Sequence, residues 1–245
     1  MRHWFTLYTA GFLLAFLALS ANAQTYQHTA IWLRLAPTYT LDENWSVVGD
    51  MFYRRQSHPD HGLINPFDSP LLWAGRAGIA YRTKQGQYTL YPAVFFYSSP
   101  SLGNTSDLKR AVVPEWRPSA LAEWTVDLSG KSALRLRAGY EYRIFTTPGL
   151  TDLGRMRFRA AWRQGIGRSA YGQIWNETLL SAPPNLPASG NLFDINRSNA
   201  AAGFALSNIS TLEVGYQFTH RQRRSLIEFD DDHALTITLF LKINP

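Results

Sequence analysis

Residues 134–145 read LRLRAGYEYRIF, and their side chains alternate between apolar and mostly polar or charged with a period of two. Only an extended strand places every second residue on one face, so no helix produces this pattern. One face carries Leu134, Leu136, Ala138, Tyr140, Tyr142 and Ile144, and the other carries Arg135, Arg137, Gly139, Glu141, Arg143 and Phe145. The stretch predicts a β-strand with one apolar and one strongly ionic face.

The same alternation recurs along most of the chain. In the next run, Met156, Phe158, Ala160 and Trp162 oppose Arg155, Arg157, Arg159, Ala161 and Arg163. Eleven such runs lie at roughly 28–40, 45–57, 71–83, 87–98, 113–127, 132–146, 154–164, 169–181, 193–206, 210–223 and 233–243. Short connections alternate with longer ones, such as 58–70, 99–112 and 224–232, which predicts an antiparallel hairpin meander.

Composition excludes several classes of protein. The 245 residues include no cysteine and only 17% charged residues, so neither a disulfide scaffold nor a largely disordered chain is expected. Twenty of the 24 basic residues are arginine, which favours planar ion pairs in confined places. No Lys/Arg run exceeds two residues, so the net charge of +6 does not indicate a nucleic-acid partner.

The N-terminus has the pattern of a secretory signal peptide. Arg2 provides a positive charge, residues 12–19 form a short apolar stretch, and Ala21-Asn22-Ala23 fits a cleavage site. The apolar stretch is shorter than a membrane-spanning helix requires. We therefore expect cleavage after Ala23 and a single domain over residues 24–245.

The ionic strand faces distinguish an outer-membrane barrel from a secreted β-sandwich. Stacked arginines are unusual on the solvent face of a sandwich, whereas a barrel turns them into a polar lumen where carboxylates pair with them. We therefore predict an all-β, antiparallel, up-and-down transmembrane β-barrel with an Arg/Glu-rich lumen. The predicted lumen network is Arg117, Glu115, Glu123, Arg135, Arg137, Glu141, Arg143, Arg155, Arg157, Arg159, Arg163, Glu177, Arg197 and Glu213.

The alternation of inward and outward positions along the strands also predicts the charge of this lumen. Fifteen arginines face inward against seven carboxylates, a surplus of eight positive charges. Long arginine side chains fill a narrow barrel, and unpaired guanidinium groups attract anions. Aromatic residues near the ends of runs, such as Trp45, Tyr53 and Trp73, suit the two interfacial girdles of a membrane barrel.

The strand count and the prolines are harder to fit. Bacterial single-chain barrels usually have an even number of strands, so we expect ten to twelve strands and prefer twelve. A missed N-terminal strand, a misread run or an N-terminus inside the lumen would each explain the odd count. Pro37, Pro92, Pro114 and Pro118 lie inside runs, where bulges are expected.

Several short motifs follow one another in a recognisable order over most of the chain. They are Pro114-Glu115-Trp116-Arg117-Pro118, Arg157-Phe158-Arg159, Asn176-Glu177, Asn196-Arg197, Leu212-Glu213-Val214-Gly215-Tyr216 and Asp232-His233, with Trp32, Trp45 and Tyr53-Arg54 upstream. This order resembles a family of Gram-negative envelope proteins, domain of unknown function 2490. The resemblance implies an outer-membrane β-barrel and brings no reaction or substrate. Such barrels usually end in an aromatic residue, whereas this sequence ends in Pro245.

Two polar segments contain residue types that bind metal ions. His58, Asp60 and His61 lie in one predicted loop, and Asp230, Asp231 and Asp232 form the densest acidic run. The spacing of an EF-hand is absent. We interpret both segments as solvated loops and predict no metal site.

Catalytic residues are equally sparse. His220 and His233 fall on the outward parity of the last two runs, near Ser225 and the acidic run, and could form a hydrolase triad. No G-x-S-x-G turn accompanies them.

The sequence therefore favours a non-enzymatic outer-membrane protein of a Gram-negative bacterium with a narrow, anion-preferring or plugged lumen. Its expected partners are outer-membrane lipids and lipopolysaccharide, the barrel-insertion machinery and a small anionic solute, with no cofactor. Two alternatives stay open: an outer-membrane enzyme that hydrolyses lipid or lipopolysaccharide, and a secreted β-sandwich binding protein.

Overall fold

The computed structural model describes residues 24–62, 64–187, 190–223 and 225–244. The strands are β1 (Gln24–Thr40), β2 (Trp45–Gln56), β3 (Ser69–Arg82), β4 (Gly86–Ser98), β5 (Val113–Trp116), β6 (Ser119–Ser129), β7 (Ser132–Phe145), β8 (Leu153–Ile166), β9 (Ala170–Ala182), β10 (Phe193–Ala205), β11 (Ser210–Gln222) and β12 (Glu228–Ile243). A short 3-10 helix, η1 (Thr105–Lys109), precedes β5. Among the described residues no helix is long and apolar enough to cross a membrane. The predicted signal peptide, residues 1–23, lies outside the described residues.

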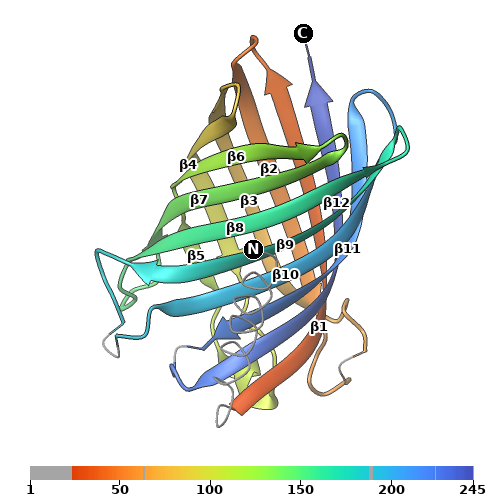
Figure 1. Cartoon of the computed structure of the whole chain (residues 1–245). Coiled ribbons are helices and arrows are strands. Elements are labelled where there is room, and N and C mark those ends of the chain that lie inside the picture. The colour runs from red at the N-terminus through yellow and green to blue at the C-terminus, as the bar shows by residue number, and fades with distance from the viewer. Residues whose placement is uncertain (1–23, 63, 188–189, 224, 245) are drawn as a thin grey trace, which may run out of the picture.

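Eleven of the strands close into a barrel whose strands are strongly tilted (Figure 1). Consecutive strands pair in chain order, and β12 returns to pair with β1. The four-residue β5 stands outside this count because it lies between the same two neighbours as β6, namely β4 and β7. The closed ring confirms the prediction of an all-β barrel and excludes a β-sandwich. The preference for twelve strands was wrong, whereas the eleven runs match the ring.

The barrel closes with a parallel pair, so the prediction of a wholly antiparallel barrel was wrong at this seam. β1 and β12 run in the same direction, in register from Gln24 opposite Glu228 to Tyr39 opposite Ile243. An odd number of strands that alternate in direction must bring two like-directed strands together when the ring closes. The odd count therefore needs neither a missed strand nor a threaded N-terminus.

The prolines in strands have unequal effects. At Pro92 the β3–β4 register shifts between Ala77 and Ile79, because a residue without an N–H cannot continue the ladder. Pro118 separates β5 from β6, so the predicted run 113–127 is two strands. The bulges expected at Pro37 and Pro114 are not found, since both residues keep their place in a ladder without a register shift.

The two ends of the barrel differ, as the alternation of connection lengths predicts. Short turns join the strands at what we call the short-turn end, the upper end in Figure 1. Longer connections gather at the opposite, long-loop end, and they span residues 57–68, 99–112, 146–152, 183–192 and 223–227. Both β1 and β12 begin at the long-loop end.

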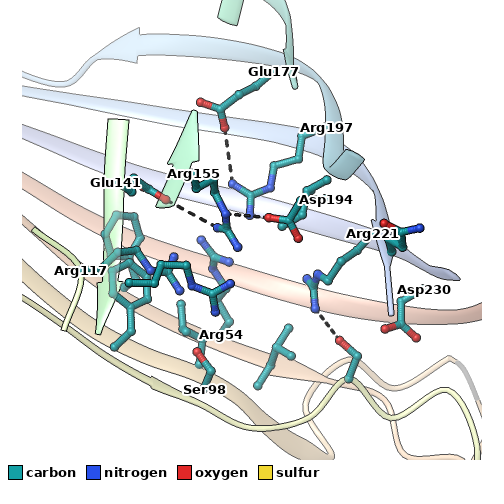
Figure 2. A pocket seen from close by; sticks show the side chains of 18 of the residues that line it. Arg54, Ser98, Arg117, Glu141, Arg155, Glu177, Asp194, Arg197, Arg221 and Asp230 are labelled. Carbon is teal, nitrogen blue, oxygen red and sulfur yellow. Dashed lines mark hydrogen bonds and ion pairs between the residues drawn. The ribbon is translucent and has the colours of Figure 1, made fainter. Parts of the chain in front are cut away.

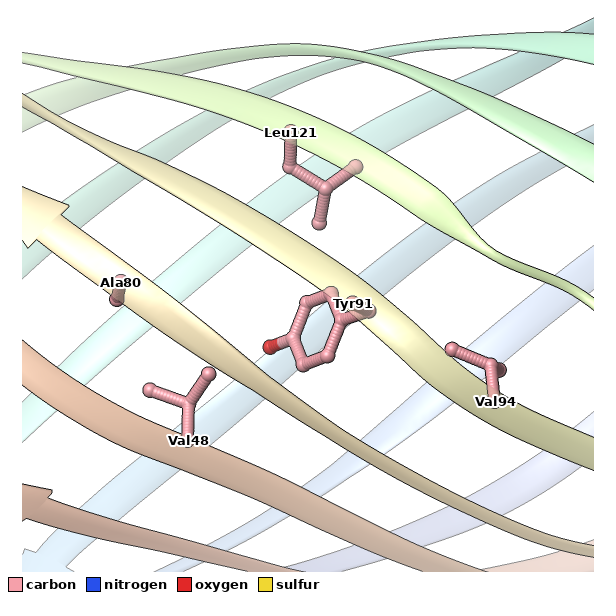
Figure 3. Packing of buried hydrophobic residues seen from close by; sticks show 5 residues of the cluster. All are labelled: Val48, Ala80, Tyr91, Val94 and Leu121. Atoms are coloured by element: carbon pink, nitrogen blue, oxygen red, sulfur yellow. The ribbon is translucent and has the colours of Figure 1, made fainter.

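One side of the lumen is apolar. Val48, Ala80, Tyr91, Val94 and Leu121 pack together on the inner face of the wall formed by β2, β3, β4 and β6 (Figure 3). The inner faces of β7 and β8 instead carry seven arginines, three on β7 and four on β8. The apolar cluster is therefore local, because Asp50 of β2 pairs with Arg34 of β1 and Arg76 of β3 close to it.

The register of the closing seam is testable with a disulfide, because the chain has no cysteine of its own. Leu35 lies opposite Leu239, and both side chains are on the outer face. We expect Leu35→Cys with Leu239→Cys to form an intramolecular disulfide under mild oxidation, seen as a mobility shift on a non-reducing gel.

The matched control pairs Leu35→Cys with Ile243→Cys, which lies on the same face about 13 Å further along β12. That pair should cross-link far more slowly. Equal rates for the two pairs would contradict the parallel register.

Candidate functional site

The lumen contains a cavity of about 1310 Å³ lined mainly by polar and charged side chains. It extends from the long-loop end along the inner faces of β7–β11. Alternation along these strands turns every second residue inward, as it does for Arg155, Arg157 and Arg159 on β8. This cavity is the candidate functional site, because it gathers most of the arginines of the described chain.

The recurring unit of the site is one carboxylate held between two guanidinium groups. Glu141 accepts from Arg157 at 2.5 Å and lies 3.5 Å from Arg155. Glu177 contacts Arg157 at 2.8 Å and Arg197 at 3.4 Å. Both glutamates are only 3% exposed, so little water screens these pairs. Charge-assisted hydrogen bonds of this kind compensate for the loss of hydration of buried ions.

Three further carboxylates repeat the arrangement around the barrel. Glu115 binds Arg117 and Arg143, Glu123 binds Arg137 at 2.7 Å and Arg159 at 3.3 Å, and Asp50 binds Arg34 and Arg76 at 2.5 Å each. Several pairs arise directly from strand register: Glu123 lies opposite Arg137, Glu141 opposite Arg155 and Glu177 opposite Arg197. Directly opposite residues share a face and are close enough to pair.

Three members of the predicted network have other neighbours. Glu213 accepts hydrogen bonds from Tyr171 at 2.7 Å and Gln173 at 2.9 Å, both at the same oxygen. Arg163 donates to Gln173 and lies 3.8 Å above the ring of Tyr171. Arg135 has no carboxylate within salt-bridge distance in the part of the chain that the structure describes, and its Nε is buried without a hydrogen bond. This group lies in the short-turn half of the lumen.

Residues 99–112, which we call the crossing loop, extend across the mouth of the barrel at the long-loop end. The loop leaves β4 and is fastened to the far wall, where Asp107 receives two hydrogen bonds from Arg223, directly after β11, at 2.9 and 3.1 Å. Arg221 donates to Ser101 at 2.6 Å, and the Gln56 side chain bonds the backbone of Pro100 and Leu102. The lumen is therefore covered at this end.

The anchor of the crossing loop is ionic. Asp107 is 2% exposed, and burial alone would raise the pKa of its carboxyl group. The hydrogen bonds and charge of Arg223 outweigh burial and hold that pKa below its usual range. Asp107 is therefore ionised at neutral pH, and the anchor weakens only as the pH falls through this lowered pKa.

The positive surplus is smaller than the sequence indicates. The cavity is lined by fifteen arginines and eight carboxylates. Three carboxylates outside the lining, Asp50, Glu123 and Asp232, also pair with these arginines. Among the described residues, the arginines therefore outnumber the carboxylates by four. The alternation of inward and outward positions did not identify Asp107 as an inward carboxylate, because Asp107 lies in a loop. It also did not identify Asp194, because the β9–β10 register shifts next to that residue. Asp194 binds Arg155 at 2.6 Å.

The acidic run near the C-terminus lies in strand β12 rather than in the predicted loop. Its side chains consequently alternate. Asp230 and Asp232 point inward, where Asp230 binds Arg223 and Asp232 binds both Arg221 at 2.9 Å and His28 at 3.0 Å. Asp231 points outward and contacts His220 at 2.6 Å. The three aspartates therefore do not converge on one ion.

The histidine-containing loop also lacks a converged ligand set. His58 lies 3.8 Å from Asp60, and His61 lies 3.8 Å from Asp68. The rings of His58 and His61 are 4.9 Å apart. No group of three or more potential metal ligands occurs among the described residues.

The catalytic candidates face opposite sides of the barrel wall. Ser225 lines the lumen, whereas His220 and His233 lie on the outer face. His220 stacks on Phe229 at 4.4 Å, and His233 contacts the Tyr216 hydroxyl at 2.7 Å. The structure does not bring these residues together as a nucleophile and its base.

Comparison with known proteins gives one family match. The family described as protein of unknown function, DUF2490, matches residues 29–229. No curated protein matches the sequence. The matched range covers the barrel from β1 to the start of β12, including the crossing loop and all the shared carboxylates.

Removing one shared carboxylate tests the energetic weight of the network. Glu141→Gln leaves Arg155 and Arg157 with one charged partner each, Asp194 and Glu177 respectively. We expect the free energy of unfolding in a denaturant titration of detergent-refolded protein to fall by about 3 to 5 kcal/mol. Glu213→Gln is the control, because an amide oxygen can still accept from Tyr171 and Gln173, and it should cost less than about 1.5 kcal/mol. Equal losses would show that the shared carboxylates have no special role.

Proposed function

Because the chain belongs to the DUF2490 family, whose description assigns no activity, we propose its function from the barrel itself. The protein is an outer-membrane β-barrel of a Gram-negative bacterium and acts without catalysis. Its lumen is narrow, covered by the crossing loop and selective for anions. The outer wall of the barrel supports the proposed location, and the charges of the lumen support the proposed selectivity.

Two rows of exposed aromatic residues on the outer wall carry the proposal of a membrane location. Each aromatic residue of one row has a counterpart in the other row eight positions away in the sequence. Because the strands are tilted, eight residues correspond to roughly 20 Å along the barrel axis. This approaches the apolar band of outer-membrane barrels, about 25 Å tall. The paired residues are Trp45 and Tyr53, Trp73 and Tyr81, and Trp116 and Trp124, each between 37% and 51% exposed.

The outer face between these rows is apolar. On β2 it consists of Val47, Gly49 and Met51, and on β3 of Gly75, Ala77 and Ile79. A shallow depression over β3–β8 continues the apolar surface with Leu90, Ala120 and Phe158 among its lining residues. An exposed apolar belt of this extent is unfavourable in water and favourable against lipid.

A cluster of polar residues on the outer wall of β9 and β10 is hydrogen-bonded internally. Asn176 of β9 and Asn196 of β10 exchange hydrogen bonds at 3.0 and 3.2 Å. Asn176 also donates to Ser198, and Asn196 donates to Thr178. Internal pairing of this kind is what a hydrocarbon environment requires of polar groups.

Location and partners follow from the same proposal. The pattern of residues 1–23 is consistent with export, and cleavage would follow Ala23. Outer-membrane lipids and lipopolysaccharide would contact the apolar belt and its aromatic borders, and the barrel-insertion machinery would be needed to place the barrel in the membrane. A small anionic solute is the expected occupant of the lumen, because the described arginines that line the cavity outnumber by four the carboxylates that line it or pair with them.

Placing a charge in the belt tests the membrane location. Ala77 is exposed midway between Trp73 and Tyr81. Ala77→Arg should lower the free energy of unfolding in lipid bilayers by about 2 to 4 kcal/mol, whereas Asn208→Arg in the turn after β10 should change it by about 1 kcal/mol or less. Recovery of the wild-type protein in the soluble periplasmic fraction, or equal effects of the two arginines, would overturn the proposal.

Releasing the crossing loop tests the covered lumen. In planar bilayers under a salt gradient, the wild-type protein should give little or no current. Asp107→Asn removes the charge by which the loop binds Arg223, while Arg223 keeps its pair with Asp230. The change should increase the frequency of open events, which should be anion-selective. Ser106→Ala, next to it and exposed, serves as the control and should behave like the wild type. A sizeable cation-selective current would contradict the assigned lumen charge.

A further inference from the structure

The long-loop half of the lumen contains guanidinium groups that the carboxylates do not fully satisfy. Figure 2 shows Arg54, Arg117, Arg155, Arg197 and Arg221 around the same part of the cavity, whose lining also includes residues of the crossing loop. They come from strands far apart in the sequence. Their convergence therefore results from barrel closure and not from a local sequence motif.

Arg54 is the least compensated of these residues. Its guanidinium carbon lies 3.6 Å from the ring centroid of Trp32, and its Nε is buried without a hydrogen-bond partner. In the described part of the chain, no carboxylate lies within salt-bridge distance of Arg54. The charged groups around it are Arg117, Arg197 and Arg221, all positive, and the negative Asp232.

Two neighbouring arginines are held in a similar way. Arg117 lies 3.8 Å above the ring of Phe96, and Arg197 lies 5.6 Å from the ring of Trp32. Each has a buried Nε that makes no hydrogen bond. Stacking occupies the flat faces of a guanidinium group and leaves its N–H edge free to donate. The aromatic rings thus orient these groups without using their donors.

The carboxylates of this region are already shared. Glu177 forms ion pairs with both Arg157 and Arg197. Asp232 contacts both His28 and Arg221. Bringing further guanidinium groups together in a desolvated cavity is unfavourable unless another anion balances them. The arrangement is that of a site whose counter-charge comes from a ligand.

We propose that Arg54, Arg117, Arg197 and Arg221 form a binding site for an oxyanion of the phosphate class, with Trp32 and Phe96 as the aromatic supports. The site extends the anion-preferring lumen of the proposed function, on which it rests. Several converging guanidinium groups favour an anion with more than one charge and with oxygens that accept from several donors at once. A monovalent halide meets neither condition.

The crossing loop restricts the source of the phosphate group. Arg221 binds Ser101 of the loop at 2.6 Å, so the roof of the site is in direct contact with it. A phosphate group on a membrane lipid would have to displace the loop, whereas a free phosphate ion or a small phosphorylated solute fits beneath it. The ligand we infer is therefore a small solute.

Isothermal calorimetry of the full barrel in detergent, with inorganic phosphate as the probe, tests the site. We expect saturable binding by the wild type and an affinity reduced about tenfold or more in Arg54→Gln, since that change removes donors to a charged ligand. Arg54→Gln orphans no carboxylate, so the variant should fold. Arg135→Gln is the matched control, because Arg135 is also an inward arginine without a carboxylate partner but lies in the short-turn half, and it should bind phosphate within twofold of the wild type.

Parallel titrations separate the alternatives. Glycerol 3-phosphate binding more tightly than inorganic phosphate would identify a phosphorylated solute as the ligand class, and the reverse order would identify the free ion. No binding by the wild type, binding of chloride equal to that of phosphate, or equal losses in Arg54→Gln and Arg135→Gln would overturn the site. Calorimetry needs no membrane, so phosphate binding without anion-selective conductance would refute conduction alone, and conductance without binding would refute the site alone.

Discussion

A buried carboxylate shared by two arginines is the interaction on which this barrel depends. Each strand contributes side chains to one face only at every second residue, so a charge placed inside must find its partner on a neighbouring strand at the same level. Glu141 of β7 and Glu177 of β9 do this through Arg157 of the intervening β8, which contacts both. The shared ion pairs thus connect strand to strand from within, and they occupy space that an empty cylinder would leave to water.

Sequence periodicity was sufficient for the parts of the structure that depend on local alternation. The eleven runs, the lengths of the connections and the inward placement of Glu123 opposite Arg137 all follow from counting residues in twos. Counting fails wherever the ladder is interrupted. Asp194 lies beside a register shift, and Asp107 reaches its partner through a loop that crosses the lumen, so no periodic rule assigns them an inward position.

The closing seam lies beyond sequence reasoning for a different reason. Whether β1 meets β12 depends on the curvature and shear of the whole sheet, and no segment of the sequence records these. The acidic run 230–232 shows the consequence. Its composition is typical of a loop, yet Asp232 is fully buried because the strand that carries it pairs on both sides and turns it toward His28 and Arg221. Tertiary pairing overrides the local preference there.

The parallel seam also governs the order in which the barrel can form. Its register joins Gln24 to Glu228, about 200 residues apart, whereas every other strand pair in the ring joins neighbours in the chain. Hairpins can assemble as soon as their two strands have been synthesised, but the last row of backbone hydrogen bonds requires the first and final strands together. Closing so long a loop has a high entropic cost, and contacts of this range form slowly. Until then, two strand edges with unpaired N–H and C=O groups stay open at once, and a chain shortened by its last strand would leave β1 without its parallel partner.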